Sequence, residues 1–277
     1  MDYKKITIYL SLLIIVVLAI VLLKNCSTKS QHQQNGFTAR DFDEIKEDGV
    51  IRIVTAYNQT GYFVKGDTIS GFQYDLANLF GKALGLSVEI YPEMDLQKSI
   101  AGLESGQYDI IARNLPVTVD LRDKVSLTEP LILNKQVLIQ RTAEYNDGIE
   151  PIRNQLDLAK KTLYVSEDSP SLLRINNLST EIGDTVYVEE MKKYESEQLI
   201  IMVAKGDIDY AVCDEITAKN LKPRFPEIDI DTDISFTQLQ AWAVRKDSYE
   251  LLDSLNSWVI RLKENREIEK IQQRYFR

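Results

Sequence analysis

The chain alternates between two patterns of hydrophobic residues from Val50 onward. Short apolar runs such as 51–54 have the length and β-branched composition of buried strands. Between them lie longer segments such as 72–84, whose apolar residues stand three and four positions apart, the spacing of a helix with one buried face. Strands that alternate with helices predict mainly parallel sheets covered by helices, and therefore an α/β fold.

This pattern assigns most of the chain to helices and strands. The predicted strands are 51–54, 86–91, 109–112, 135–140, 162–165, 185–188, 209–212 and 240–244. The predicted helices are 72–84, 96–103, a helix that Ser169 and Pro170 open, 194–204 and 251–275. With 277 residues, the chain has room for one large domain or two of moderate size.

Two segments repeat each other along the chain. Residues 103–112 and 203–212 each end a helix at a glycine, Gly106 or Gly206, and each places an aspartate three residues later, before an apolar strand. Coincidence between common helix endings is one explanation. The other is a pair of similarly built lobes, which commonly bind small molecules in the cleft between them.

The N-terminal region predicts a membrane anchor. Residues 6–23 are almost entirely apolar, and a helix of that length spans about 27 Å, close to the hydrocarbon thickness of a bilayer. No small residues form a cleavage site after the run, so we expect 1–24 to remain as an uncleaved signal anchor. Lys4 and Lys5 favour a cytoplasmic N-terminus. Residues 25–46 then form a linker, and the globular part lies in the periplasm at the cytoplasmic (inner) membrane.

The two cysteines are not expected to form a disulfide. Cys26 follows the apolar run and is a candidate lipidation site, although Lys24 and Asn25 lack the small side chains that this processing prefers. Lipidation is therefore the alternative to an uncleaved anchor. Cys213 lies in an apolar run and is expected to be a buried thiol.

Composition argues against several classes of function. A net charge of −9 is unsuited to a nucleic-acid partner. The single histidine, His32, lies in a polar stretch, which leaves none for a catalytic triad or a histidine-rich metal site. Asp229, Asp231 and Asp233 lack the glycine and glutamate of a calcium loop and are expected on the outer face of a strand. We therefore predict no catalytic residue, metal or cofactor.

Thr118 and Arg122 form a candidate carboxylate receptor at a predicted strand-to-helix junction. The arginine offers a bidentate pair of donors, and the threonine hydroxyl and the first helical N–H groups supply others. An ordinary surface arginine on a short helix is the alternative.

Several motifs, taken in order, resemble a known family. They are Gly71-Phe-Gln-Tyr-Asp75-Leu-Ala, the repeat at 103–109, the segment from Thr118 to Thr128-Glu-Pro130, and Gly206-Asp-Ile-Asp209-Tyr-Ala-Val-Cys-Asp214. With them, residues 48–276 resemble the family 3 extracellular solute-binding domain, the type 2 binding proteins that serve polar amino acids. The opening at 51–63 and the closing run 235–245 are most similar to the N-terminal regulatory domain of the membrane-bound lytic transglycosylase F family.

The resemblance implies a two-lobed, periplasmic-binding-protein-like (type 2) fold with two hinge strands. Lobe 1 would comprise 47–134 and 240–277, and lobe 2 would comprise 135–239. The family's ligand contacts fall here on seven residues: Arg122, Thr118 and Ser169 for the α-carboxylate of the ligand, Asp214 for its α-ammonium, and Tyr57, Asn58 and Phe72 for its side chain.

Three departures from the family pattern matter. Gln73 stands where the family has Asp or Glu, and Thr118 and Arg122 are four residues apart where three is more usual. The sequence ends at Arg277, where a lytic transglycosylase would begin its catalytic domain, so cell-wall cleavage by these residues is not expected.

Three functions therefore compete. The first is a membrane-tethered binding protein for an amino acid, short peptide or cell-wall fragment, whose partner is a transporter permease or a cell-wall enzyme. In the latter case it would be a non-catalytic regulatory partner of a lytic transglycosylase. The second is a dehydratase-like enzyme on the same fold, which needs a positioned general acid or base. The third is a degenerate domain without a ligand.

Overall fold

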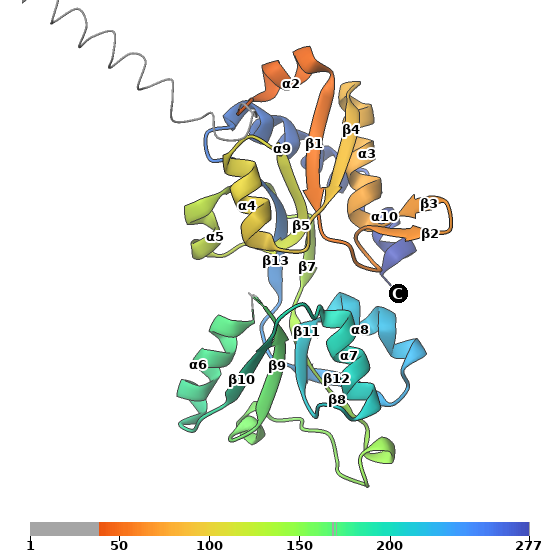
Figure 1. The fold of residues 1–277 in the computed structure, drawn as a ribbon, viewed down its shortest axis with the longest axis vertical. Helices are drawn as coiled ribbons and strands as arrows, with labels where there is room; N and C mark the ends of the chain where they lie inside the picture. The colour runs from red at the N-terminus through yellow and green to blue at the C-terminus, as the bar shows by residue number, and fades with distance from the viewer. Residues whose placement is uncertain (1–38, 168, 170, 277) are drawn as a thin grey trace, which may run out of the picture.

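The computed structural model describes residues 39–167, 169 and 171–276 as two lobes stacked along the longest axis (Figure 1). The predicted anchor, most of the linker and Cys26 lie outside these residues. Within the described part of the chain, no helix combines the length and the apolarity needed to cross a membrane.

The first lobe is built from the two ends of the described chain. Its N-terminal part contains α2 (Phe42–Asp48), β1 (Val50–Thr55), β2 (Phe63–Lys65), β3 (Thr68–Ser70), α3 (Phe72–Leu84), β4 (Ser87–Pro92), α4 (Leu96–Glu104), β5 (Ile110–Pro116), α5 (Val119–Lys124), β6 (Ser126–Leu127) and β7 (Ile132–Asn134). Its C-terminal part contains β13 (Gln238–Val244), α9 (Tyr249–Glu264) and α10 (Glu267–Tyr275).

The second lobe is a single continuous segment. It contains β8 (Gln136–Arg141), the short 3-10 helices η1 (Ala143–Tyr145) and η2 (Gln155–Leu158), β9 (Thr162–Ser166), α6 (Leu172–Ile182), β10 (Tyr187–Met191), α7 (Ser196–Lys205), β11 (Ala211–Asp214), α8 (Glu215–Leu221), η3 (Lys222–Arg224) and β12 (Ile228–Asp233).

Each lobe has a mixed sheet of the same plan. The first has the strand order β4-β1-β5-β13-β6, with β7 also on β13, and the second has β10-β9-β11-β8-β12. Three strands in each sheet are parallel, as predicted, and the next strand is antiparallel to them. That strand, β13 or β8, arrives from the other lobe. It enters the sheet at the carboxyl ends of the parallel strands and must run against them.

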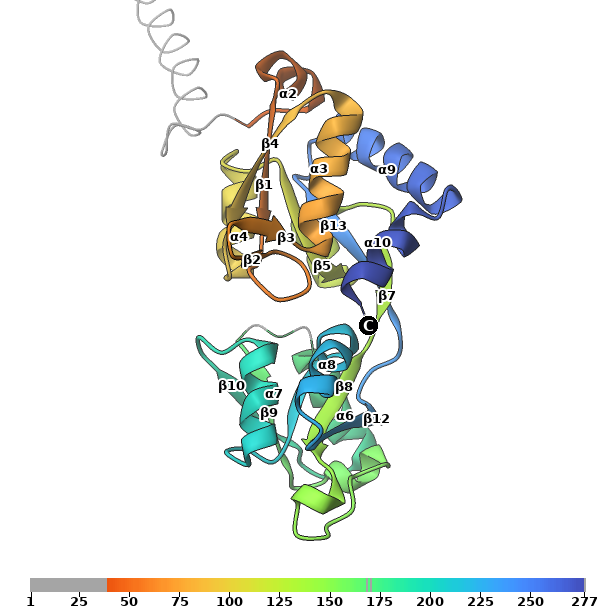
Figure 2. The same cartoon turned by 90° about the vertical axis from the view of Figure 1, so that its right-hand side faces the viewer.

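Two connections join the lobes on one side of the molecule (Figure 2). The chain leaves the first lobe between β7 and β8 and returns between β12 and β13. The outgoing and returning strands pair with each other, with Asn134 opposite Gln238 and Leu133 opposite Leu239. This pairing makes the hinge a two-stranded ribbon.

Helices cover both faces of each sheet and enclose separate cores (Figure 1). In the first lobe, α3, α9 and α10 pack on one face around Phe80, Trp242 and Trp258, and α4 covers the other face. In the second lobe, α7 and α8 cover one face and α6 the other. Each lobe therefore has cores of its own.

The repeated segments end in a matching contact in each lobe. Asp109 follows α4 and accepts a hydrogen bond from the backbone N–H of Arg52 at 2.8 Å, and the Arg52 side chain donates to the carbonyl of Gly106 at 3.2 Å. Asp209 follows α7 and binds the guanidinium of Arg141 at 2.7 Å, which also donates to the carbonyl of Ile208. In each lobe, the repeated segment therefore ends in a loop after a helix that is held by hydrogen bonds from an arginine.

Three predicted details are wrong. The helix predicted for 251–275 is broken into α9 and α10, because Arg266 adopts the left-handed conformation (φ 56°). The helix after β9 begins at Leu172 with Ser171 as N-cap, later than Ser169 and Pro170 suggested. Asp229 does not lie on an outer face: it is buried, because it pairs with both Nη atoms of Arg153, at 2.6 and 2.7 Å.

Candidate functional site

A cleft of about 800 Å³ lies between the lobes. Loops that follow the parallel strands form much of its wall, because the carboxyl ends of these strands in both sheets face the gap, and the end of β5 and the hinge strands β7, β8 and β13 supply the rest. Ligands in α/β proteins commonly bind outside the carboxyl ends of strands. Among the described residues, the lining charged side chains are Glu93, Asp95, Asp120, Glu167, Glu195 and Asp214 and the cations Lys98, Arg113, Lys124 and Lys193.

The loop after β1 supplies Tyr57 and Asn58, both of which line the cleft. The Asn58 side-chain oxygen accepts hydrogen bonds from the backbone N–H groups of Thr60 and Gly61, at 3.1 and 2.5 Å, and thereby fixes the turn. Tyr57 is exposed at 47%, and its backbone N–H donates a hydrogen bond to the sulfur of Met94. A preorganised loop thus presents an aromatic ring at the rim.

Gln73 contributes to the cleft, whereas its neighbour Phe72 does not. Phe72 is fully buried in the core of the first lobe and packs against Phe276, with ring centroids 4.8 Å apart and the ring planes tilted by 42°. The Gln73 side chain accepts a hydrogen bond from the indole N–H of Trp242 and donates one to Asn114, both at 2.6 Å. A glutamine suits this position because it can both accept and donate.

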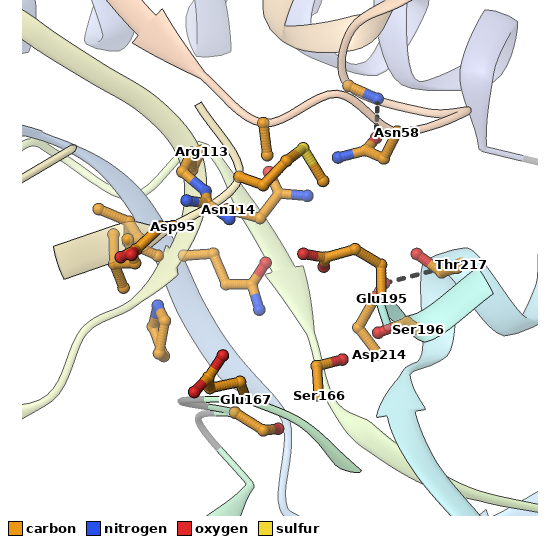
Figure 3. A pocket seen from close by; sticks show the side chains of 18 of the residues that line it. Asn58, Asp95, Arg113, Asn114, Ser166, Glu167, Glu195, Ser196, Asp214 and Thr217 are labelled. Carbon is orange, nitrogen blue, oxygen red and sulfur yellow. Dashed lines mark hydrogen bonds between the residues drawn. The ribbon is translucent and has the colours of Figure 1, made fainter. Parts of the chain in front are cut away.

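Arg113 extends from β5 into the cleft (Figure 3). Its Nη1 atom is sealed from solvent and has no hydrogen-bond partner among the described residues. Burial lowers the pKa of Arg113 from its ordinary value, although Glu195, Glu93 and Asp95 oppose the shift. The cleft therefore contains a desolvated cation with unused donor capacity.

Carboxylates face Arg113 from both lobes. Asp95 lies on the first-lobe side, and Glu167 and Glu195 lie on the second-lobe side (Figure 3). Burial raises the pKa of Glu195, and Arg113 acts in the opposite direction. Glu195 is placed by the start of α7, where the Gln198 side chain accepts a hydrogen bond from its backbone N–H at 2.9 Å.

Asp214 lines the cleft at the end of β11 and also has a structural role. Its Oδ1 atom accepts a hydrogen bond from the backbone N–H of Thr217 at 2.9 Å, which caps α8, and another from the Asn134 side chain at 3.2 Å. This capping role was not predicted from the sequence. A substitution at Asp214 therefore affects the stability of the protein as well as the cleft.

The predicted carboxylate receptor is divided by the structure. Thr118 lines the cleft and caps α5 through a hydrogen bond from the backbone N–H of Leu121. Arg122 is exposed on α5 and lies outside the residues that line the cleft. Arg122 is four residues after Thr118, the N-cap of α5, so its side chain lies about one helical turn beyond that cap. Ser169 lines the cleft from the second lobe, and its hydroxyl lies 2.6 Å from that of Ser171.

The lobes also touch across the gap, away from the hinge. The backbone N–H of Gln59 in the first lobe donates to Glu197 of α7 at 2.7 Å, and Arg224 of η3 donates to the Gln59 side chain at 3.0 Å. Ile216 of α8 packs against the core of the first lobe. These contacts join the two lobes on the side of the cleft away from the hinge.

Five of the residues predicted to bind a ligand line the cleft: Tyr57, Asn58, Thr118, Ser169 and Asp214. Arg113 and Glu195 also line it and were not predicted. Glu195 had a sequence signal, because it lies at the start of a predicted helix, whereas Arg113 lies within β5, which continues four residues past its predicted end at 112. Charged residues at such positions face the ligand edge of an α/β sheet. Within the described ranges, no three acidic, histidine or cysteine side chains are arranged to hold a metal ion.

Comparison with known proteins identifies the family. Residues 50–277 match the sequence model of the bacterial extracellular solute-binding proteins, family 3. The chain is 27% identical to the membrane-bound lytic murein transglycosylase F of Photobacterium profundum, over 94% of this chain and 49% of that protein. It is 30% identical to the protein of the same name from Desulfosudis oleivorans, over 84% of this chain and 50% of that protein. The chain thus spans about half the length of these curated relatives.

Solved structures share the two-lobed fold. An ancestral arginine-binding protein bound to arginine superposes with a TM-score of 0.71 and 25% identity, covering 83% of this chain and 99% of that one. The amino-acid ABC transporter substrate-binding protein AbpA of Streptococcus pneumoniae, bound to L-arginine, gives 0.72 at 21% identity, covering 85% and 98%.

Proposed function

Because the chain belongs to family 3 of the bacterial extracellular solute-binding proteins, we propose that it binds a small polar ligand between its lobes. The ligand is an amino acid or a short peptide. In this proposal the N-terminal segment tethers the lobes to the inner membrane, and they act in the periplasm. No catalytic step is assigned to the cleft.

The observation that carries the proposal is the charge arrangement of the cleft. Carboxylates from both lobes and the desolvated cation of Arg113 line one cavity at the carboxyl ends of the strands. A ligand with separated positive and negative groups complements such walls better than an apolar one. Among the described residues, the lining carboxylates outnumber the lining cations, which favours a ligand with surplus positive charge. The ancestral arginine-binding protein shows that this fold accommodates one such ligand.

A second candidate comes from the relatives. Because the curated relatives are lytic murein transglycosylases about twice as long, the chain is also suited to act as a non-catalytic regulatory partner of such an enzyme. Its ligand would then be a murein fragment, and its partner a cell-wall enzyme and not a transporter permease.

Thermal unfolding of the full chain in detergent tests both candidates. The panel contains L-arginine, L-glutamine, tri-L-alanine and soluble murein fragments. A ligand present at about one hundred times its dissociation constant stabilises the folded state by about 2.7 kcal/mol, which raises the unfolding midpoint by several degrees. We expect an amino acid or the peptide to do so. A response to murein fragments alone would favour the regulatory candidate, and no response to any of them would contradict ligand binding of this type.

A further inference from the structure

The cleft contains a cation, Arg113, whose hydrogen-bond donors are not all satisfied by the described residues. Arg113 Nη1 is sealed from solvent, and no hydrogen-bond acceptor reaches it from the part of the chain that the structure describes. A buried charge without a hydrogen-bond acceptor costs free energy. A guanidinium can bind a carboxylate through two parallel hydrogen bonds. Arg113 is therefore poised to receive an anion from a ligand.

The surrounding carboxylates do not fill this role. Glu93, Asp95 and Glu195 act on Arg113 through their charges, yet none supplies an acceptor to Nη1. Glu195 belongs to the opposite lobe and is itself desolvated, which raises its pKa. A cation from the first lobe and a carboxylate from the second thus face one cavity with their charges only partly compensated.

Arg122, the residue that the sequence pattern favoured, is differently placed. Its side chain is exposed on α5 and does not line the cleft. An exposed guanidinium stays hydrated, so an ion pair with a ligand contributes little binding free energy there. Its position in the cleft and its burial both favour Arg113 over Arg122 as the residue that binds an anion.

We propose that Arg113 binds the anionic group of a zwitterionic ligand and that Glu195 binds its cationic group from the other lobe. This assignment rests on the proposed function and names the residues that would bind the two charged groups of the ligand. The ligand class is an amino acid or short peptide with a free carboxylate and a free amine. Such a molecule bridges the lobes, so its binding and the contacts between the lobes support each other.

Matched probes isolate the contact with Arg113. L-arginine and tri-L-alanine are each titrated calorimetrically beside their C-terminal amides, which lack the carboxylate. For the wild-type chain, the amide is expected to bind roughly tenfold to a hundredfold more weakly than the acid, the range that corresponds to a charged hydrogen bond. Arg113→Gln should remove this difference. Glu195→Gln should weaken acid and amide alike by about tenfold, because both retain the amine.

Two comparisons make the titration decisive. Arg261→Gln, on the outer surface of α9, serves as the matched control and should retain the preference for the acid. If Arg122→Gln removed the preference and Arg113→Gln preserved it, the assignment would be overturned in favour of the sequence-based one.

A measurement without ligand separates this inference from the proposed function. Replacing an unsatisfied buried charge with an apolar side chain of similar length is expected to stabilise the empty protein, so Arg113→Met should raise the unfolding midpoint by a few degrees. A lower midpoint would show that the carboxylates of the protein already satisfy Arg113, and would overturn the inference. If no probe binds while the midpoint rises, the amino-acid proposal fails and the anion site at Arg113 stands.

Discussion

Asp109→Ala is expected to lower the free energy of unfolding by about 3 kcal/mol, because it removes the buried one of the two carboxylates that pair with the buried Arg40 and leaves only the more exposed Asp48. The Asp109 side chain is 1% exposed, and Arg40 donates to it through Nε at 3.3 Å and Nη2 at 2.5 Å. The backbone N–H of Arg52 donates to the same carboxylate. The substitution thus removes the carboxylate that accepts from Arg40 and Arg52, two residues far from Asp109 in sequence.

The second lobe provides a matched control for this prediction. Asp209 occupies the equivalent position in the repeat, but its side chain is 71% exposed. Asp209→Ala should cost only about 0–1 kcal/mol, because an exposed ion pair contributes little. Urea unfolding of both variants measures the difference. Equal losses at the two sites would contradict the argument that burial decides the effect.

Gly71→Ala is expected to cost at least about 3 kcal/mol and to impair ligand binding. Gly71 has φ +140°, in a region that only glycine populates readily, and an added Cβ would lie 2.1 Å from the carbonyl oxygen of Gly61. That oxygen accepts a hydrogen bond from the backbone N–H of Gln73 at 2.9 Å. Relief of the clash must move the loop that carries Tyr57 and Asn58, and therefore one wall of the cleft.

Gly85, at the other end of α3, allows the effect of backbone strain to be separated from the effect of the steric clash. It also has a positive φ, of 71°, but an added Cβ would meet no described atom within 4 Å. Gly85→Ala should cost about 1 kcal/mol from backbone strain alone and leave the cleft unchanged. Thermal unfolding and ligand titration of both variants provide the comparison. A Gly71 variant that behaved like the Gly85 variant would contradict the close packing of the loop on α3.

The two α/β lobes could be predicted from the sequence, because each lobe repeats the same local pattern. The glycine that ends a helix and the aspartate that follows are local features, and a single chain displays them. The antiparallel direction of β8 and β13 is not local: it follows from the lobe in which the preceding strand lies. Only the path of the chain through the hinge determines it.

The site was harder to predict because burial determines its chemistry. Arg113 and Arg122 are both arginines near one strand end, and only packing makes the first desolvated and the second exposed. Phe72 and Gln73 illustrate the same limit. Their motif identified the start of a helix, but the direction of each side chain follows from how α3 lies on its sheet. The aromatic ring consequently enters the core and the amide reaches the cleft.

The central claim is that the cleft between the lobes holds one small polar molecule. Native mass spectrometry of the full chain, purified in detergent from growing cells, measures this most directly. We expect chains that carry one small molecule with both an amine and an acid group, and the same compound should raise the unfolding midpoint of ligand-free protein. Chains that carry no small molecule, and whose midpoint does not respond to the low-molecular-mass fraction of a cell extract, would contradict the claim.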